Sequence, residues 1–68
     1  MTNTSKFEAV LILKGKTKTD IAKVINRSLQ TVYNKINNIV DFKSKEIVAI
    51  CEYLELTDEE REEIFFAK

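Results

Sequence analysis

The near absence of helix-breaking residues is the feature that most constrains the fold of this chain. Its 68 residues contain no proline, and the only glycine is Gly15. Proline and glycine are the residues that most strongly disfavour a helix interior. Apolar residues also recur along almost the whole sequence at intervals of three and four, which is the spacing of one face of a helix. The sequence therefore predicts an all-α fold.

Capping signals divide this periodic pattern into five helices. We expect the first over residues 4–14, with Thr4 or Ser5 as its N-cap and Gly15 as a left-handed stop. Thr17 and Asp20 form a capping box before a helix over 18–25, and residues 57–60 form another before a helix that ends in 64–66. The two remaining helices are expected over 28–37 and 44–55. The prediction is a compact five-helix domain that spans residues 1–68.

Length and composition indicate a small soluble domain. A chain of 68 residues suffices for one domain, and its 44% apolar and 32% charged residues are typical of a compact soluble protein. The longest apolar run, residues 9–13, is far shorter than the roughly 20 residues that cross a bilayer. No pattern of a cleavable leader follows Met1, so we expect a cytoplasmic protein without a membrane partner.

The residue types used most often in catalysis and metal binding are scarce. There is no histidine, and Cys51 is the only cysteine, so the usual zinc ligand sets and the commonest general base are missing. Cys51 falls in the apolar stripe of a predicted helix, where an inert thiol is expected. The acidic residues of 58–63 suit the first turns of a helix. We therefore expect no enzyme activity, metal, cofactor or small-molecule substrate.

Zero net charge conceals two halves of opposite sign. Residues 1–45 hold nine basic and three acidic side chains, whereas residues 46–68 hold two basic and eight acidic ones. A basic surface is the electrostatic footprint of nucleic-acid binding. An acidic half is expected to face away from phosphate or toward a basic partner. The charge pattern thus favours a molecule with one end suited to nucleic acid.

The junction between the second and third predicted helices is unusually short. The second helix ends at Ile25 and Ser28 already caps the third, so only two or three residues reverse the chain. A steep crossing is then expected, as in a helix-turn-helix. Asn26 tolerates the left-handed backbone that such a turn requires. Ala22 leaves room for the third helix, and the crossing is expected to be filled by Ile21, Ile25, Val32 and Ile36.

The segment TKTDIAKVINRSLQTVYNKIN, residues 17–37, resembles the helix-turn-helix of the lambda-repressor-like family. It is most similar to small temperate-phage regulators of the Cro-like or repressor-modulator kind. Residues 41–67 resemble the fourth and fifth helices of such proteins, so the resemblance covers nearly the whole chain. Asn26 replaces the family's usual glycine. Arg27 replaces a usual apolar residue, and its charge could reach a phosphate or loosen the turn.

The resemblance implies a sequence-specific transcriptional regulator whose third helix, about residues 28–37, enters the major groove of operator DNA. The matching base-reading positions are Leu29, Gln30, Tyr33 and Asn34. Gln30 and Asn34 have the chemistry for bidentate contact with adenine, and Leu29 could touch a thymine methyl group. Tyr33 has two interpretations, because it could contact DNA or belong to the apolar stripe of its helix.

Phosphate contacts are expected from residues near the helix ends and from the surrounding cations. The expected phosphate-binding residues are Lys16, Lys18, Arg27, Ser28, Thr31, Asn37 and Asn38. Further positive charge without sequence information is expected from Lys14, Lys35, Lys43 and Lys45.

Two kinds of partner besides DNA remain open. A homodimer is expected because one helix reads only a few base pairs. The apolar end of the fifth helix, Ile64, Phe65 and Phe66, is the predicted dimer or partner interface, although Phe65 or Phe66 could instead complete the core. The alternative function is a modulator, an antirepressor or co-repressor that docks on a phage repressor and binds DNA weakly. Either function belongs in the cytoplasm of a bacterial host.

Overall fold

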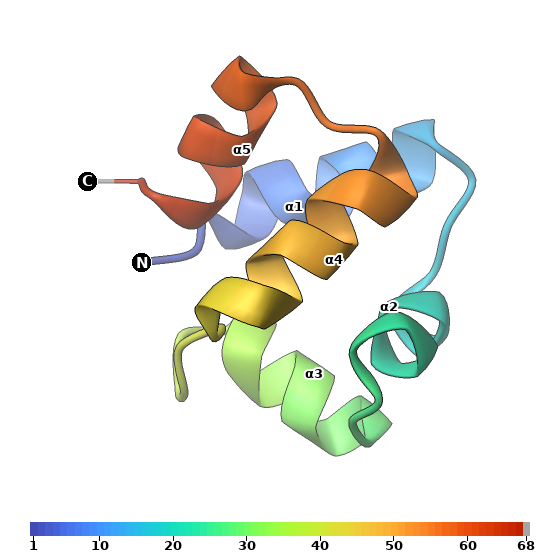
Figure 1. The fold of residues 1–68 in the computed structure, drawn as a ribbon. Helices are drawn as coiled ribbons and strands as arrows, with labels where there is room; N and C mark the ends of the chain where they lie inside the picture. The colour runs from blue at the N-terminus through green and yellow to red at the C-terminus, as the bar shows by residue number, and fades with distance from the viewer. Residues whose placement is uncertain (68) are drawn as a thin grey trace.

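Five α-helices form the regular structure of residues 1–67, which are the residues that the computed structural model describes (Figure 1). No strand occurs among these residues. The all-α prediction and the number of helices are confirmed, the bounds of the second helix match, and the other bounds differ from those expected by at most one residue at an end. The helices are α1 (Thr4–Leu13), α2 (Lys18–Ile25), α3 (Leu29–Ile36), α4 (Ser44–Leu54) and α5 (Asp58–Phe65).

Side-chain caps begin four of the five helices. The hydroxyls of Thr17, Ser28 and Thr57 accept hydrogen bonds from backbone amides in the first turn, as the sequence predicted. The expected cap of α1 was wrong: Asn3, not Thr4 or Ser5, accepts from the Lys6 amide at 3.1 Å. Thr4 is instead the first helical residue, and its hydroxyl donates to the carbonyl of Ile36 at 2.6 Å.

Four helices end in a left-handed residue. Gly15, Asn26, Asn38 and Glu55 have φ values of 67°, 56°, 65° and 54°. In each case the amide after the left-handed residue donates to a carbonyl five residues earlier, which is the Schellman arrangement. The expected roles of Gly15 and Asn26 as helix stops are confirmed. Glu55 is the least suited of the four, because in this conformation Cβ lies too close to the following carbonyl oxygen, and only glycine and, less often, asparagine or aspartate adopt it readily.

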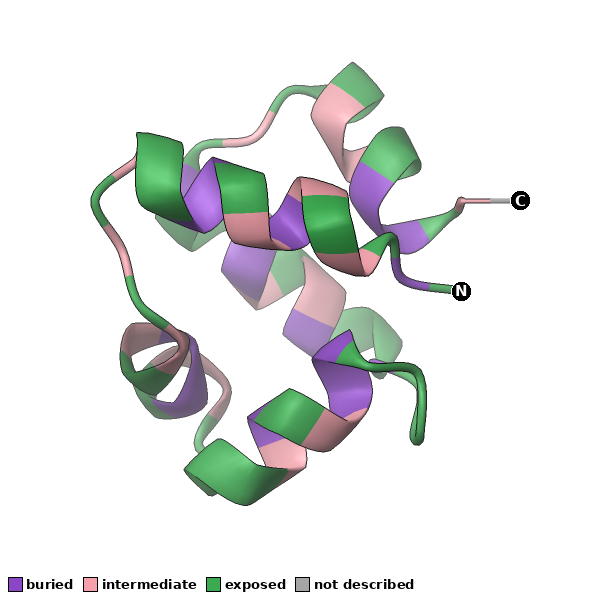
Figure 2. Cartoon of the chain, turned by 180° about the vertical axis from the view of Figure 1, so that it is seen from behind, coloured by how far each residue is buried: buried purple, intermediate pink, exposed green. Residues whose placement is uncertain are grey.

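The core is built around three phenylalanine rings from distant parts of the sequence. Phe7 stacks on Phe42 with centroids 5.9 Å apart, and Phe65 meets both rings edge-on at 5.5 and 5.4 Å. Figure 2 shows that the buried positions of the helices face one another. The aliphatic residues around the rings come from all five helices. They include Val10, Leu11, Ile21, Val32, Ile36, Ile50, Leu54 and Ile64.

Burial at the end of α5 corrects the predicted partner interface. Ile64 is 0% exposed and Phe65 is 4% exposed, because both pack in the chain's own core. Phe66 remains 50% exposed. Of the two aromatic residues, Phe65 completes the core, and only Phe66 remains available for contact with a partner. Cys51 is partly buried, and this burial raises the pKa of its thiol, consistent with an inert role.

The first residues of the chain connect α3 to α5. The Thr2 amide donates to Asn38 Oδ1 at 2.8 Å, and Asn38 Nδ2 donates to the Thr2 carbonyl at 2.9 Å. The Asn3 amide donates to the Ile64 carbonyl at 2.6 Å. These bonds fix the loop after α3 against the start of α1.

The helices enclose a body of 27 × 25 × 21 Å. α5 lies at one end of this body and α3 at the other, with α4 running between them (Figure 1). None of the helices in residues 1–67 combines the length and the apolar character that crossing a bilayer requires.

Candidate functional site

The corner between α2 and α3 has the geometry that the sequence predicted. Asn26 is left-handed, and the Arg27 amide donates to the Ala22 carbonyl at 2.9 Å. Ser28 then starts the next helix, accepting from the Thr31 amide at 3.1 Å. The two helices pack against each other and cross steeply, as both views of the ribbon show (Figures 1 and 2). Ala22 on α2 is buried.

The four predicted base-reading residues share the outward side of α3. Leu29 and Tyr33 are each 38% exposed, so neither is a core residue despite its place in the apolar stripe. Gln30 is exposed and Asn34 is partly exposed, one turn apart. Gln30 Nε2 donates to Asn34 Oδ1 at 3.1 Å. This bond orders the two amide groups side by side and leaves their remaining donors and acceptors for another molecule.

A cation of α2, Lys18, borders this outward side. The Lys18 ammonium group lies 4.9 Å from the centroid of the Tyr33 ring and 2.6 Å from a carboxylate oxygen of Glu8. Lys16 lies in the loop before α2, 5.0 Å from the ring of Tyr53, and this contact places it against α4 rather than α3. A cation over an aromatic face is attracted by the ring, so these contacts hold both lysines at defined places. Lys18 and Tyr33 therefore form one continuous surface across α2 and α3.

Apart from Arg27, the remaining predicted phosphate-binding residues divide into two groups. Ser28 and Thr31 lie together in the first turn of α3, with their hydroxyls 2.9 Å apart, and Asn37 is exposed at its end. The side chain of Asn38 is not available for a phosphate as these are. Its side-chain oxygen and nitrogen are both bonded to the backbone of Thr2. Its amide is therefore a structural link, which corrects its prediction as a phosphate ligand.

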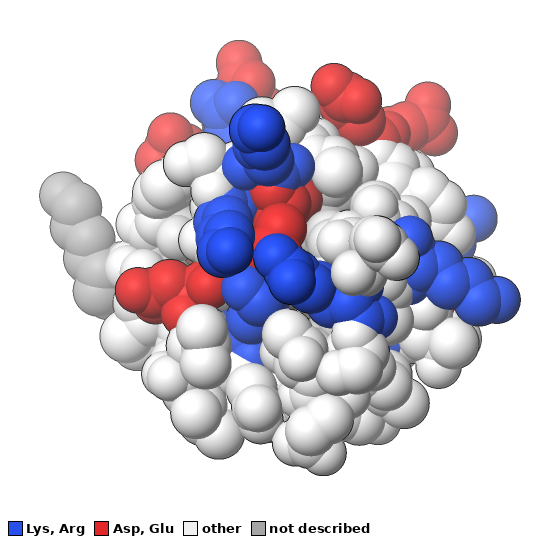
Figure 3. Space-filling view, turned by 60° about the horizontal axis from the view of Figure 1, so that its bottom comes forward, with Lys and Arg blue, Asp and Glu red and all other residues white. Residues whose placement is uncertain are grey.

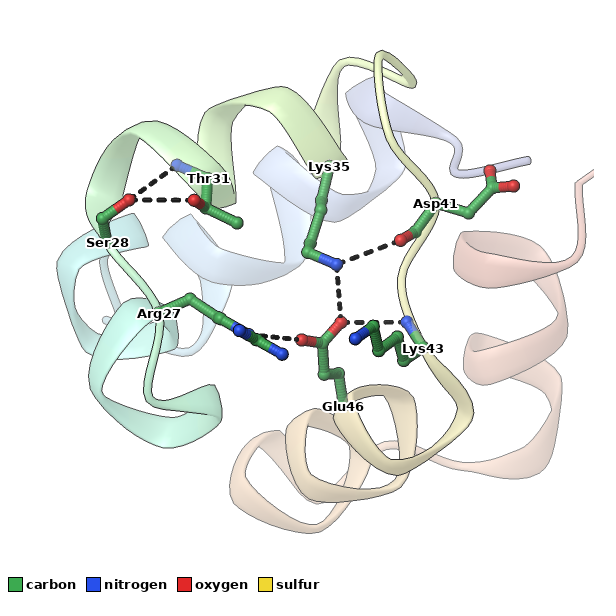
Figure 4. A network of polar contacts seen from close by, with 7 residues as sticks. All are labelled: Arg27, Ser28, Thr31, Lys35, Asp41, Lys43 and Glu46. Atoms are coloured by element: carbon green, nitrogen blue, oxygen red, sulfur yellow. Dashed lines mark hydrogen bonds and ion pairs between the residues drawn. The ribbon is translucent and has the colours of Figure 1, made fainter.

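Glu46 is the centre of a polar network that joins α3, α4 and the corner (Figure 4). Its carboxylate accepts from Lys35 Nζ at 2.9 Å, from Arg27 Nε at 3.2 Å and from the Lys43 amide at 2.9 Å. Lys35 Nζ also donates to the carbonyl of Asp41 at 3.1 Å. Burial alone would raise the pKa of Glu46, but these hydrogen bonds outweigh it and hold that pKa below its ordinary value. Glu46 is thus an ionised, buried anchor.

The network corrects one expected source of free positive charge and explains another. Lys35 is 4% exposed, so it cannot serve as a surface cation. Arg27 does not loosen the turn, because its Nε bond to Glu46 ties the turn to α4. The Arg27 side chain remains 45% exposed and is still within reach of solvent. Glu46 was not predicted from the sequence. A signal was present, because Lys35 lies between Val32 and Ile36 on the inward side of its helix, and a buried ammonium group requires a compensating acid.

Charge is distributed unevenly over the surface of the molecule. Figure 3 brings the α3 end forward and shows lysine and arginine side chains gathered in a band on this face. Smaller acidic areas lie within and beside the band, and further acidic side chains lie at the far edge. α5 carries Asp58, Glu59 and Glu60 in its first turn, at the opposite end from α3. The acidic first turn of α5 therefore lies away from α3, whereas α1 of the basic half packs against α5, where Lys6 pairs with Glu63.

The chemistry offered at the α3 end consists of hydrogen bonding, apolar contact and charge. No three cysteine or acidic side chains among residues 1–67 are grouped as metal ligands. Comparisons with protein-family models, with curated proteins and with solved structures found no match.

Proposed function

We propose that the chain is a sequence-specific DNA-binding regulator of the lambda-repressor-like, Cro-like kind, with α2 and α3 as its helix-turn-helix. The observation that carries the proposal is the outward side of α3. It presents two amide side chains, an aliphatic one and an aromatic one on a short, firmly capped helix. These are the groups that read adenine and thymine edges in a major groove.

Positions around α3 supply the contacts that hold a duplex in place. Lys18 and Arg27 border the helix, and the hydroxyls of Ser28 and Thr31 lie at its N-terminal turn. Lys16 lies in the loop before α2, against Tyr53 of α4. The amides of a helix N-terminus and nearby cations are suited to phosphate oxygens. In the proposed complex, α3 enters the groove while these residues contact the two backbones beside it.

The proposal is tested by selecting duplexes from a randomised library with the purified chain and measuring the affinity of the selected and unselected DNA. We expect the selected site to bind at least a thousandfold more tightly, the lower end of the usual specificity range, which is roughly a thousandfold to ten-millionfold. Affinity should fall linearly on a logarithmic salt scale, with a slope of about −0.9 for each phosphate engaged. If the selection enriches no sequence over the unselected library, the proposal is contradicted.

A homodimer is part of the proposal, because a half-site of a few base pairs gives little specificity. Light scattering at several protein concentrations tests it directly. A dimer is expected at micromolar concentrations when selected DNA is present. A selected site without a repeated half-site, together with one chain per duplex, would contradict this part.

A second candidate function is a modulator that docks on another regulator, such as a phage repressor, and binds DNA weakly. It is favoured by the acidic surface of α5 and by exposed apolar side chains next to it, Val48 and Phe66. DNA binding that is negligible at physiological salt, with a stable and salt-insensitive complex between the chain and a repressor, would favour this function over the first.

A further inference from the structure

Two carboxylates pair with the cations that border α3, and they do so on opposite sides of the helix. Glu8 accepts from Lys18, which lies against the ring of Tyr33. Glu46 accepts from Arg27 and also from Lys35. Tyr33 and Lys35 are two positions apart, so they point to nearly opposite sides of α3. Each edge of the helix therefore has one cation that is paired with one acid.

The pair on the α2 edge engages the whole charged group of the lysine. An ammonium group is a compact point charge on a single nitrogen. That nitrogen of Lys18 lies 2.6 Å from a carboxylate oxygen of Glu8. A phosphate that approaches Lys18 must displace Glu8 or share the same nitrogen with it. Glu8 thus competes with a phosphate.

The pair on the α4 edge leaves most of the guanidinium group available. Within residues 1–67 the side chain of Arg27 makes one hydrogen bond, from Nε to Glu46 at 3.2 Å. Further N–H donors lie on both terminal nitrogens of a guanidinium group. The Arg27 side chain is 45% exposed, whereas that of Glu46 is 7% exposed. The buried carboxylate therefore holds the inner nitrogen, and the terminal nitrogens remain for another acceptor.

The positive charge of Arg27 is also retained, because Lys35 neutralises Glu46. Lys35 Nζ lies 2.9 Å from Glu46 Oε1, and its side chain is 4% exposed. Two cations thus share one carboxylate, and Arg27 is the more exposed of them. The Lys43 amide also donates to Glu46 at 2.9 Å. Glu46 is therefore a fixed point from which Arg27 presents an uncompensated charge.

Arg27 lies beside two hydroxyl groups that suit the same ligand. It directly precedes Ser28, whose hydroxyl lies 2.9 Å from that of Thr31. Thr31 and Lys35 are four positions apart and share the side of α3 that faces Glu46. Figure 4 shows the Arg27 side chain extending from this end of α3 toward the start of α4. This edge of α3 therefore combines a fixed guanidinium group with hydroxyl donors.

We infer that Glu46 is a positioning residue for DNA binding, which holds the Arg27 guanidinium group through Nε so that its terminal nitrogens meet a phosphate beside α3. The inference rests on the DNA-binding function proposed above. A long side chain that is already ordered loses less rotamer freedom when it binds. Glu46 then strengthens DNA binding, although its negative charge alone would weaken it.

The test measures the affinity of the full-length chain for a random-sequence duplex at salt concentrations between about 50 and 200 mM. Glu46→Gln removes the charge of the anchor with little change of shape. We expect the affinity to fall about two- to tenfold, which corresponds to the rotamer freedom of one long side chain. Glu8→Gln is the matched control, because it removes an acid from the other edge of α3. It should raise the affinity by up to about fivefold, since Lys18 loses a competing partner.

A double-mutant cycle separates positioning from a loss of stability. Arg27→Ala should weaken binding and make the slope of log affinity against log salt shallower by about 1. In the Arg27→Ala chain, Glu46→Gln should no longer lower the affinity, because the side chain that Glu46 orients is gone. A weakened fold would lower the affinity in both backgrounds. Circular dichroism at the temperature of the titration checks that each variant is folded.

The wild-type chain provides a readout that needs no variant. The Nε–H signal of Arg27 should be resolved in NMR spectra of the free chain, because its bond to Glu46 slows exchange with water. The signal and the bond should both persist when the random duplex is added.

Three results would overturn the inference. A Glu46→Gln chain that binds the random duplex as tightly as the wild type, or more tightly, would show that Glu46 does not assist binding. An equal fall in both backgrounds of the cycle would assign Glu46 to stability alone. Release of the Arg27 Nε–H from Glu46 on binding would show that the phosphate displaces the carboxylate. Because the duplex is random, failure to select a preferred sequence would contradict the proposed function and leave these readouts intact.

Discussion

The two sides of α3 differ in how fully the chain satisfies its own side chains. On the inward side, Val32, Lys35 and Ile36 are buried, and the Lys35 ammonium group bonds to Glu46 and to a backbone carbonyl. On the outward side, the amides of Gln30 and Asn34 bond to each other. One eight-residue helix is thus fixed in the fold by its inward side and presents its outward side to other molecules.

Two lysines illustrate the same difference. Lys35 is buried with its charge compensated, so its contribution is to stability. Lys18 pairs with Glu8 while its side chain stays 25% exposed, next to the half-exposed ring of Tyr33. Partly exposed ion pairs contribute little to stability, so Lys18 can exchange its partner for a phosphate at small cost. Substitutions on the two sides of α3 should separate these two roles.

Glu46→Ala should be the most damaging of the substitutions, because it leaves the Lys35 charge buried without a partner. Removing one member of a buried ion pair typically costs about 3–5 kcal/mol. Urea denaturation followed by circular dichroism measures the loss. Glu63→Ala is the matched control, since it removes a glutamate from an exposed pair with Lys6, and it should cost less than about 1 kcal/mol. Equal losses for the two variants would contradict the anchoring role of Glu46.

Acid should weaken the inward side through the same carboxylate. The pKa of Glu46 is lower in the folded chain than its ordinary value of 4.5. Its contribution to stability is therefore complete above about pH 4.5 and is lost as the pH falls through the lower folded value. The free energy of unfolding, measured from pH 7 to pH 2, should decline in this window. A Glu46→Gln variant should show a smaller decline, and an unchanged pH profile would contradict the assignment.

Gln30→Ala should act on the outward side without affecting the fold. Loss of one good base contact costs roughly 1–3 kcal/mol on the preferred DNA and relaxes preference at one base position. Electrophoretic or fluorescence titration with single-base variants of the selected site measures this change. The exposed side chain predicts an unchanged melting temperature. A variant that loses stability but keeps its base preference would reverse the assignment of the two sides.

Lys18→Ala should weaken binding to all DNA sequences alike. The slope of log affinity against log salt should become shallower by about 1, because one phosphate contact is lost. Lys23→Ala, on the exposed surface of the same helix, is a control for the general loss of one positive charge. A sequence-dependent loss for Lys18→Ala would show that the lysine contacts bases.

Glu55→Gly should stabilise the chain, because Glu55 holds a left-handed conformation that disfavours residues with a side chain. The penalty is roughly 1–2 kcal/mol, partly offset by the greater flexibility of glycine in the unfolded chain. A gain of about 0.5–1 kcal/mol is expected in urea denaturation. Asn26→Gly at the α2–α3 corner should change stability less, since asparagine tolerates this conformation. A larger gain at Asn26 would show that the corner is strained.

Features governed by neighbours in the sequence were predictable. The capping boxes at Thr17 and Thr57, the left-handed Asn26 and the helix start at Ser28 each depend on residues within three or four positions. The outward position of Gln30 follows from helical spacing once Val32 and Ile36 are assigned to the core. These local signals specify the helices and most of the candidate site.

Features that depend on distant partners were not predictable in the same way. Nothing near Lys35 in the sequence identifies Glu46, eleven residues later, as the acid that pairs with it in the core. Asn38 resembles a free helix-end amide until the backbone of Thr2 is placed beside it. The division of Ile64, Phe65 and Phe66 into core and surface depends on where Phe7 and Phe42 meet α5. Long-range packing decides which polar and apolar residues remain available for binding.

The most direct measurement is an NMR titration of the full-length chain with a duplex chosen by selection. The outward side of α3 is expected to respond first, with the largest amide and side-chain shifts at Gln30, Tyr33 and Asn34 and with almost none on α5. A random duplex should shift the lysine-bordered surface but not the side-chain amides of Gln30 and Asn34. Shifts centred on α5, or identical responses to the two duplexes, would contradict base reading by α3.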